Sequence, residues 1–599
     1  MRFLRNVLAT LVGLFVFFGL ITLIFAGIIA AASSEEEVEV EANSVLKLEL
    51  NRPVVEREND DPFSDLSLPG NDNAGVIGLI ELRRAIQAAK DDDNIKGIYL
   101  VTGVAPAGWA AYEEIRNELI DFKASDKFIV AYSDFLTESG YYLGSVADEL
   151  HLFPEGLVEF NGIYQGVTFV KEGLEKLGVE PRIFRVGQFK GAVEPFIRDD
   201  ISEENRMQIE SYLGSIYDTY LQGLAQTTNL SETKLREIAD SMQVFLPQQA
   251  VDQGMVTQLS YDDQVKESIR RKLGIEEEET EQEDEGGDGE DDDDINFISL
   301  DKYRRSLDKD DEYSRNRVAV IVAEGTIVNG NGDNASIGGE KFAKEIRKAR
   351  EDDNVKAVVL RINSGGGSAS ASDQMWREVQ LTTEKKPVIA SMSTYAASGG
   401  YYMAMACDTI VAQPNTITGS IGIFGLFFGA QELLDKVGVS VDVVKTGPLA
   451  DILDPSQPLD PAEERIIQSF VNEGYETFVS KVAQGRGMTV EQVKELAGGR
   501  VYTGKEALEL DLVDILGGLD TAVAIAVRRA NLEDSDYRVR YYPEVKPLFE
   551  QILEGFEQSA STYFLKRELG PLYPHVKQLR ELEHMQGLQM RLPFMTDIR

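Results

Sequence analysis

Short apolar runs alternate with segments of helical spacing along most of the chain. Val318–Val322 is a β-branched run that ends in a glycine-containing turn, and Val355–Ile362 and Pro387–Met392 are two further apolar runs. Between the first two runs, Phe342–Arg350 places apolar residues on one helical face. A helix between successive strands predicts an α/β fold with a largely parallel sheet and right-handed crossovers. In such sheets, reactive groups tend to lie in loops beyond the carboxyl ends of the strands.

The first long apolar segment of the chain has a different character. Val7–Ala32 is uncharged and mostly apolar, and it is longer than the roughly 20 residues that cross a bilayer as a helix. Two arginines precede it and acidic residues follow, which predicts that residues 1–6 stay in the cytoplasm and that the rest is exported. A cleaved signal peptide is the alternative, but its apolar part usually has only about 7–15 residues. We therefore expect a one-pass anchor over residues 7–32.

The remainder of the chain contains one unit twice. At a constant shift of 260 residues, Asp93–Lys96 matches Asp353–Lys356, and each leads into an apolar run. Other pairs at the same shift are Tyr142 and Tyr402, Pro154 and Pro414, Gly162 and Gly422, and Gly187 and Gly447. Similarity at a fixed offset indicates a duplication. We expect a first repeat over residues 41–275 and a second over residues 317–540.

An acidic segment separates the two copies. Glu276–Asp294 has fourteen acidic residues among nineteen and no apolar side chain. Such a segment cannot offset its ordering entropy by burial, so residues 276–316 are predicted to form a solvated linker and connector. Residues 541–599 form the C-terminal tail. Amphipathic stretches such as Val545–Phe556 predict that the tail packs against the protein or contacts other subunits.

Composition narrows the classes of function. The 599 residues include 102 acidic and 60 basic side chains, and the net charge of −42 argues against nucleic-acid binding, which requires clustered Lys and Arg. The single cysteine, Cys407, excludes an intrachain disulfide framework and a thiolate metal cluster, and its alignment with Ala147 predicts a small core residue. Only three histidines are present, His151, His575 and His584, which limits zinc chemistry and histidine-based catalysis.

Two loops that differ between the copies carry candidate chemistry. Asn363–Ser368 is glycine-rich and follows a strand, so its backbone N–H groups could face a developing oxyanion; an ordinary flexible turn is the alternative. Ser398 lies between Ala and Gly at the start of a predicted helix, which suits either an activated nucleophile or a helix N-cap. The first copy has Val104–Ala107 and Glu138 at these positions.

A lysine of the first copy is the candidate base. Lys190 follows a glycine turn, has apolar neighbours, and stands opposite Ala450 of the second copy. A solvated surface lysine is the usual interpretation, but a lysine that loses solvent favours the neutral amine and can act as a base near pH 7. His151 aligns with Val411 at a strand end, so a Ser–Lys dyad fits better than a Ser–His–Asp triad. Because each copy holds one part, we expect the site where a first copy meets a second, within one chain or between chains.

These motifs together are similar to those of a known family. Ser364–Ser368, Ala397–Tyr401 and Phe189–Phe196 resemble the long bacterial form of signal peptide peptidase A, also called protease IV. The resemblance implies tandem Clp-protease/crotonase-like domains and an inner-membrane protein with periplasmic catalytic domains. It also implies a homotetramer that degrades cleaved signal peptides and other extended apolar peptides, without a cofactor or a metal.

The resemblance also assigns roles to individual residues. They are Ser398 as nucleophile, Lys190 as general base, Ser420 as the residue that orients the lysine amine, and Gly366 and Gly367 as the oxyanion hole. One departure is visible: Gly365 stands where the family usually has proline. Glycine does not restrict φ, so the loop is looser in principle, and we do not expect this to abolish activity.

Two rival functions follow from the same features. The crotonase superfold also stabilises oxyanions with backbone amides, which admits an acyl-CoA enzyme, although export from the cytoplasm argues against it. The second rival is a non-catalytic, membrane-anchored assembly scaffold. Ser398 and Lys190 argue against a scaffold, provided that the two side chains meet.

Overall fold

The computed structural model defines most of the two repeats. It describes residues 5–6, 12–17, 19–20, 38–58, 75–275, 294–307, 314–333, 335–533, 536–544, 587–592 and 598. Most of the predicted anchor, nearly all of the acidic segment and the amphipathic stretch Val545–Phe556 lie outside the described residues. Within the described ranges, no helix has both the length and the apolar character needed to span a bilayer.

The first copy is built on a parallel sheet. Its strand order is β8-β6-β5-β4-β1-β9, and every neighbouring pair is parallel. The strands are β1 (Ser44–Leu50), β4 (Ile95–Thr102), β5 (Phe128–Leu136), β6 (Glu149–Val158), β8 (Gln258–Leu259) and β9 (Phe297–Ser299). Strand β4 is buried on both faces, as expected for a parallel strand covered by helices. The edge strand β9 comes from the segment that follows the acidic residues.

The second copy repeats this plan. Its main path is β19-β17-β15-β13-β10-β21, with β16 and β20 branching from β15, and only the β17–β19 pair is antiparallel among the pairs of this sheet. The strands are β10 (Arg317–Glu324), β13 (Val355–Ser364), β15 (Val388–Ala397), β16 (Thr409–Ala412), β17 (Ile417–Gly419), β19 (Val501–Thr503), β20 (Ile515–Leu516) and β21 (Arg538–Tyr542). The expected strand over Pro387–Met392 therefore continues to Ala397, directly before Ser398.

The helices follow the same duplication. In the first copy they are α2 (Leu79–Asp91), α3 (Trp109–Lys123), α4 (Glu138–Gly144), α5 (Lys171–Leu177), η1 (Gly191–Val193), α6 (Glu194–Ile197), α7 (Glu203–Thr227), α8 (Glu232–Asp240), α9 (Pro247–Asp252) and α10 (Asp262–Leu273), followed by α11 (Leu300–Leu307). In the second copy they are α12 (Gly339–Glu351), α13 (Ala369–Thr383), α14 (Gly399–Ala404), α15 (Gln431–Lys436), α16 (Pro461–Arg486), α17 (Val490–Leu496), α18 (Gly504–Glu509) and α19 (Leu519–Arg529). Counterparts such as β4 and β13, which start at residues 95 and 355, keep the shift of 260.

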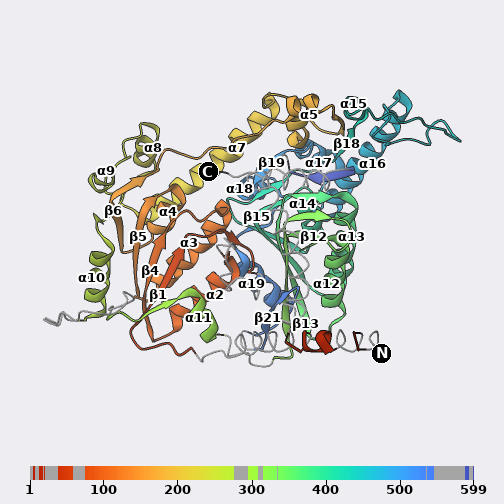
Figure 1. Ribbon diagram of the computed structural model, residues 1–599. Helices are drawn as coiled ribbons and strands as arrows, with labels where there is room; N and C mark the ends of the chain where they lie inside the picture. The colour runs from red at the N-terminus through yellow and green to blue at the C-terminus, as the bar shows by residue number, and fades with distance from the viewer. Residues whose placement is uncertain are drawn as a thin grey trace.

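A third sheet joins the copies to each other. Its order is β12-β11-β14-β22-β18-β7. The strands are β7 (Glu180–Arg185), β11 (Thr326–Val328), β12 (Ser336–Gly338), β14 (Gly366–Ser368), β18 (Phe424–Gly429) and β22 (Gly587–Arg591), and the two-stranded β2 (Val54–Val55)–β3 (Ile77–Gly78) pair is separate. Strand β7 of the first copy pairs antiparallel with β18 of the second. The long helix α7 also runs between the two copies (Figure 1), where the hydroxyls of Ser215 and Thr503 lie 2.9 Å apart.

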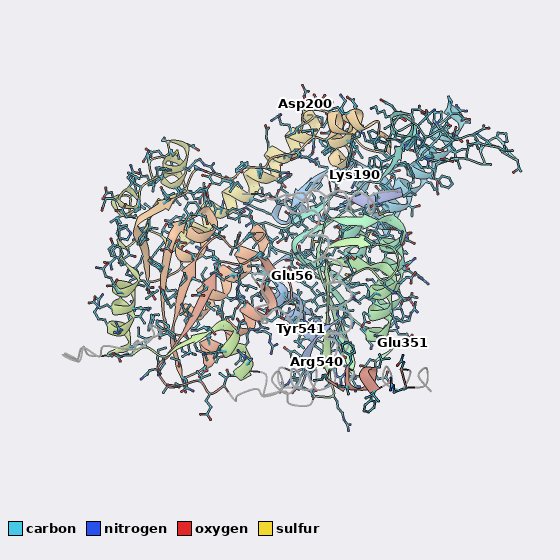
Figure 2. All side chains as sticks on the ribbon, viewed as in Figure 1. Glu56, Lys190, Asp200, Glu351, Arg540 and Tyr541 are labelled. Carbon is cyan, nitrogen blue, oxygen red and sulfur yellow. The ribbon has the colours of Figure 1, made fainter. Side chains whose placement is uncertain are left out.

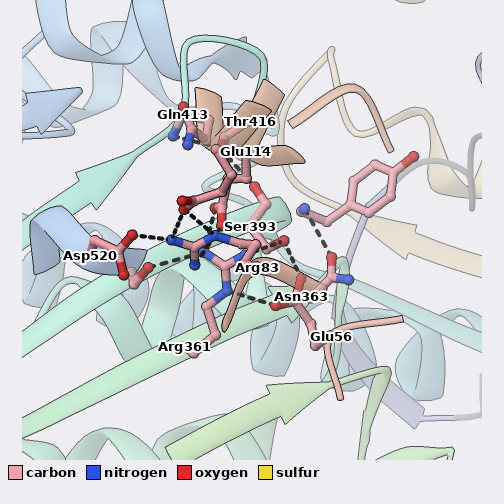
Figure 3. Close-up of polar contacts among 12 residues, drawn as sticks. Glu56, Arg83, Glu114, Arg361, Asn363, Ser393, Gln413, Thr416 and Asp520 are labelled. Atoms are coloured by element: carbon pink, nitrogen blue, oxygen red, sulfur yellow. Dashed lines mark hydrogen bonds and ion pairs between the residues drawn. The ribbon is translucent and has the colours of Figure 1, made fainter. Parts of the chain in front are cut away.

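A buried ion network also holds the two copies together, and we call this contact region between the copies the joint. Arg361 of β13 is 0% exposed, and its guanidinium donates to Glu56 at 2.7 Å and to Glu114 at 2.8 Å, two carboxylates of the first copy. The same guanidinium donates to the hydroxyls of Ser391 and Ser393 on β15 (Figure 3). Both carboxylates that compensate the charge of Arg361 therefore come from the other copy.

The network reaches the glycine-rich loop. Arg83 of α2 pairs with Asp520 of α19, which adds a second ion pair between the copies. Glu324, at the end of β10, accepts hydrogen bonds from the backbone N–H of Glu56 and from the side chain of Asn363. Burial and the nearby Glu56 raise the pKa of Glu324 to about 7. Asn363 is the first residue of the glycine-rich loop, so the joint between the copies supports the base of that loop.

Candidate active site

Ser398 occupies the sharp turn between β15 and α14. Its backbone has φ 53° and ψ −110°, which a non-glycine residue adopts only under constraint. The constraint is visible: its N–H donates to the carbonyl of Gly419 at 2.9 Å, and its carbonyl accepts from the N–H of Tyr402 at 2.8 Å. Although Ser398 stands at the N-cap position of α14, its side chain makes no capping hydrogen bond. The hydroxyl is therefore available for another partner.

Lys190 is brought to this turn by an arm of the first copy. The arm runs along β18 as β7 and then turns at Gly187, which has φ +94°. A side-chain carbon at Gly187 would lie 2.3 Å from the carbonyl oxygen of Gly498, so only glycine allows this close approach between the copies. Lys190 follows, just before η1, and is 0% exposed. Figure 2 shows it at the boundary between the two copies.

The three predicted polar site residues meet within one chain. The amine Nζ of Lys190 lies 2.8 Å from Oγ of Ser398 and 2.9 Å from Oγ of Ser420, and it donates to the carbonyl of Ser420 at 3.2 Å. Ser420 follows β17 with φ 50°, and its N–H donates to the carbonyl of Arg500 at 2.7 Å. The lysine thus comes from the first copy and both serines from the second.

Burial controls the charge of the lysine. Removal from solvent lowers the pKa of Lys190 well below its usual value, because the charged form loses hydration. Its side-chain amine contacts two hydroxyls and one carbonyl, and no carboxylate among the described residues pairs with it. The neutral amine, which has a free electron pair, is thereby favoured at this position.

The glycine-rich loop lies against the turn of Ser398. Gly366 has φ +95°, and its N–H donates to Oγ of Ser364, which in turn donates to the carbonyl of Gly325. A side-chain carbon at Gly366 would lie 2.6 Å from the amide nitrogen of Gly399, the residue after Ser398. The loop and the amide of Gly399 therefore face one small space. Gly367 continues β14 opposite Ile327 of β11.

Substituting Gly366 by alanine is expected to lower kcat by about 10²- to 10³-fold, the effect of losing one oxyanion contact. The new methyl group would enter the space in front of Gly399, and the positive φ would be strained as well. Gly487→Ala is the matched control, because Gly487 also has a positive φ but nothing lies within 4 Å of the added carbon. Peptide hydrolysis and thermal melts of both variants give the comparison. A Gly366→Ala enzyme with parental kcat would show that this space takes no part in the reaction.

The corresponding site of the first copy is filled. Glu138, opposite Ser398, accepts hydrogen bonds from the N–H groups of Asn161 and Gly162. Burial raises the pKa of Glu138 to about 7. Phe160, opposite Ser420, packs edge-on against Tyr141. The first copy therefore keeps the fold of a site without a nucleophile.

The remaining candidate groups are structural. His151 is buried on β6, where its ring contacts Ser260 and Glu149, and burial lowers its pKa. Cys407 is buried in the core of the second copy, and burial raises the pKa of its thiol. His575 and His584 lie outside the described residues. Within the described part of the chain, no cluster of three or more potential metal ligands is present.

Comparison with known proteins identifies the family. The model of "Peptidase family S49" matches residues 121–276 and again residues 380–533, once in each copy. The chain belongs to peptidase family S49. The S49 domain is thus duplicated, and the protein is a serine peptidase with two α/β domains.

Relatives match this S49 peptidase over most of its length. "Protease 4" of Haemophilus influenzae is 32% identical, covering 95% of this chain and 93% of the relative, and "Protease 4" of Salmonella typhi is 32% identical, covering 91% and 87%. "Serine protease SPPA, chloroplastic" of Arabidopsis thaliana is 35% identical, covering 77% and 67%. The solved structure of a ClpP1 mutant from Listeria monocytogenes covers 34% of this chain and 94% of its own at 16% identity, with a TM-score of 0.24, too low to support an argument.

Two parts of the site were not predicted from the sequence of this S49 peptidase. The amide of Gly399 was missed, although the residue after a nucleophilic serine commonly supplies an oxyanion donor. Strand β22, from the tail, was also missed. Its residues alternate, with Leu588, Met590 and Leu592 apolar and Gln589 and Arg591 polar, and this period of two predicts a strand.

Proposed function

We propose that this chain is an endopeptidase with a Ser/Lys dyad that degrades cleaved signal peptides and other extended apolar peptides. The observation that carries the proposal is the 2.8 Å separation of Lys190 Nζ and Ser398 Oγ in a site where burial favours the neutral amine. A neutral amine at this distance can take the proton of the hydroxyl, which a solvated ammonium cannot do.

The proposed reaction is the hydrolysis of a peptide bond. Lys190 takes the proton of Ser398 as Oγ attacks the carbonyl carbon, and the amides of Gly367 and Gly399 stabilise the oxyanion. Gly366 shapes this space, since its own N–H is bound by Ser364. The lysine ammonium, held by Ser420, then protonates the leaving amine, which forms an acyl-enzyme on Ser398. Water attacks the acyl-enzyme while Lys190 accepts its proton, and the lysine ammonium then returns that proton to Oγ of Ser398 as the C–Oγ bond breaks and the carboxylic acid product leaves.

We place the peptidase in the bacterial inner membrane. Residues 7–32 are proposed to form the anchor, with a cytoplasmic N-terminus and periplasmic catalytic domains, because the apolar stretch is long and basic residues precede it. Substrates are peptides left in or near the membrane after export. With a net charge of −42, we propose no nucleic-acid partner.

We further propose a homotetramer. Residues 431–460 are the counterpart in the second copy of the arm that carries Lys190, and Ala450, which aligns with Lys190, is exposed. Several apolar side chains of this second arm are exposed, with Val444 97% and Val437 66% accessible. The first arm covers the second copy of its own chain; the second arm would cover the first copy of the next chain. Repetition of this contact closes a ring.

The proposal is tested by cleavage of a synthetic signal peptide with the full-length, detergent-solubilised protein. We expect the parent to cleave the peptide and Ser398→Ala to be inactive while it elutes as the same assembly. Ser480→Ala, which changes an exposed serine on α16, is the matched control and should retain parental activity. Equal cleavage by the parent and Ser398→Ala would refute the proposed nucleophile, and a parent that cleaves no peptide would refute the proposed function.

The pH dependence of hydrolysis is expected to report the lysine. Because the neutral amine is the active form, kcat/KM should fall about tenfold per pH unit below the pKa of Lys190 in the free enzyme. Burial lowers that pKa well below its usual value of 10.5, so activity should be retained at neutral pH. A profile of kcat/KM from pH 4 to pH 11 measures the midpoint. A midpoint near 10.5 would mean that the active base is a solvated lysine.

A further inference from the structure

The tail strand β22 lies inside the site rather than beside it. Strand β22 pairs antiparallel with β14, the glycine-rich strand, and on its other side antiparallel with β18. It thereby separates the glycine-rich strand from β18, along which the lysine arm runs as β7. The N–H of Leu592 donates to the carbonyl of Gly365 at 2.7 Å, which continues the pairing into the glycine-rich loop. An extended segment of the chain therefore fills the gap between β14 and β18, beside the glycine-rich loop.

One carbonyl oxygen of this strand lies beside Gly366 and the amide of Gly399, at the space assigned to the oxyanion. A carbon added to Gly366 would lie 2.0 Å from the carbonyl oxygen of Met590 and 2.6 Å from the amide nitrogen of Gly399. The carbonyl oxygen of Met590 and the amide nitrogen after Ser398 thus both lie within 3 Å of a single point. In the register of the two strands, Met590 stands opposite Gly367. A peptide carbonyl presented for attack by Ser398 would occupy the same place.

The side chains of the strand are seated as those of a bound peptide would be. Met590 is 3% exposed and belongs to the buried apolar cluster of the second copy. Leu592, two residues on, belongs to the cluster of the first copy together with Ala397, the residue before the nucleophile. One strand therefore places apolar side chains into the cores of both copies.

Occupancy of the gap also accounts for the burial of the catalytic groups. Lys190, Ser398 and Ser420 are each 0% exposed. A peptidase that cleaves external chains must admit a peptide to its serine, and β22 lies across the loop that borders this serine. An incoming peptide has no place on β14 unless β22 leaves it.

We infer that residues 587–592 are an internal pseudo-substrate that competes with peptides for the active site. The inference rests on the proposed function and adds the substrate class: an extended strand with a long, flexible apolar residue, such as Met or Leu, before the scissile bond. When a competing segment fills a site, the apparent dissociation constant of the substrate increases in inverse proportion to the free fraction. Displacement of β22 therefore raises affinity for peptides without changing the chemical step.

Met590→Lys in the full-length protein tests the competition by steady-state kinetics. A lysine side chain does not suit the apolar cluster, so the segment should bind more weakly and KM for a signal peptide should fall by about tenfold or more at unchanged kcat. Met242→Lys is the matched control, because Met242 is 53% exposed and lies in the loop after α8. Unchanged KM in Met590→Lys would overturn the inference. Cleavage of the peptide by the same variant would still support the proposed function.

Hydrogen exchange supplies a second measurement that does not depend on catalysis. In the inactive Ser398→Ala protein, amides of residues 587–592 should be protected, and an excess of the peptide GLQLRL should accelerate their exchange. The peptide GLQDRL, with a charge at the position of Met590, should have no effect. If GLQLRL leaves the exchange of the segment unchanged, β22 is a permanent strand of the sheet and the inference is wrong, whatever the parent enzyme cleaves.

Discussion

Replacing Lys190 by methionine is expected to reduce peptide hydrolysis by about 10³-fold or more, the loss seen when a nucleophile is deprived of its base. Methionine fills a similar volume but has no electron pair basic enough to take the proton of Ser398. The lysine contacts its two serines at 2.8 and 2.9 Å, and no other basic side chain among the described residues forms a hydrogen bond with the hydroxyl of Ser398. Initial rates on a signal peptide, compared with the parent, measure the loss.

Lys190→Met is also expected to change the pH dependence of stability in a defined direction. The folded protein holds Lys190 with a lowered pKa, whereas the unfolded chain has the usual value near 10.5. Between these two pKa values the unfolded state binds more protons, so the stability of the parent rises with pH. Lys190→Met removes this slope, and its stability relative to the parent should therefore increase as pH falls from 10 toward the folded pKa. Lys96→Met, at an exposed position, should show neither effect. Parental activity in Lys190→Met would remove the lysine from the mechanism.

Replacing Arg361 by methionine is expected to destabilise the protein by about 3–5 kcal/mol, as when one partner of a buried ion pair is removed. Glu56, whose side chain is only 2% exposed, would lose the charge that compensates it, and Glu114, whose side chain is 1% exposed, would keep only its ion pair with Arg83. Both carboxylates belong to the first copy, so the substitution weakens the contact between the copies that holds the lysine arm against the serine. Urea unfolding followed by the fluorescence of Trp109 and Trp376, one in each copy, reports on both sides of the joint.

An exposed arginine provides the matched control for that prediction. Arg347 also pairs with a glutamate, Glu378, but its side chain is 52% exposed. Exposed pairs contribute about 0–1 kcal/mol, so Arg347→Met should shift the unfolding midpoint only slightly. Equal shifts for the two variants would mean that the network of Figure 3 does not hold the copies together.

Much of the fold could be predicted from the sequence because both copies carry regular patterns. Apolar runs predicted β10, β13 and the start of β15, and the constant shift of 260 residues predicted that the copies share one plan. The prediction that a serine from one copy meets a lysine from the other came from the divergence of the copies. Whether this happens within a chain could not be predicted, since it depends on the path of the arm after β7.

The parts that escaped prediction depend on contacts between distant residues. Glu56 and Arg361 are 305 residues apart, and nothing near either residue in the sequence indicates that they pair. Arg361 nevertheless stood within the apolar run Leu360–Ile362, and a charge inside a buried strand indicates a buried partner. The tail strand β22 is short, and its place between β14 and β18 depends on a gap that only the assembled copies create.

The most direct test of the account is complementation between two inactive chains. Lys190→Ala and Ser398→Ala chains, carrying different affinity tags, are produced together, and assemblies with both tags are isolated and assayed on a signal peptide. A site formed within each chain, as the 2.8 Å contact indicates, predicts no recovered activity. Recovery to about one quarter of the parental rate, the fraction of sites in a random mixture that would combine an intact lysine with an intact serine, would show that the dyad forms between chains and would contradict the account.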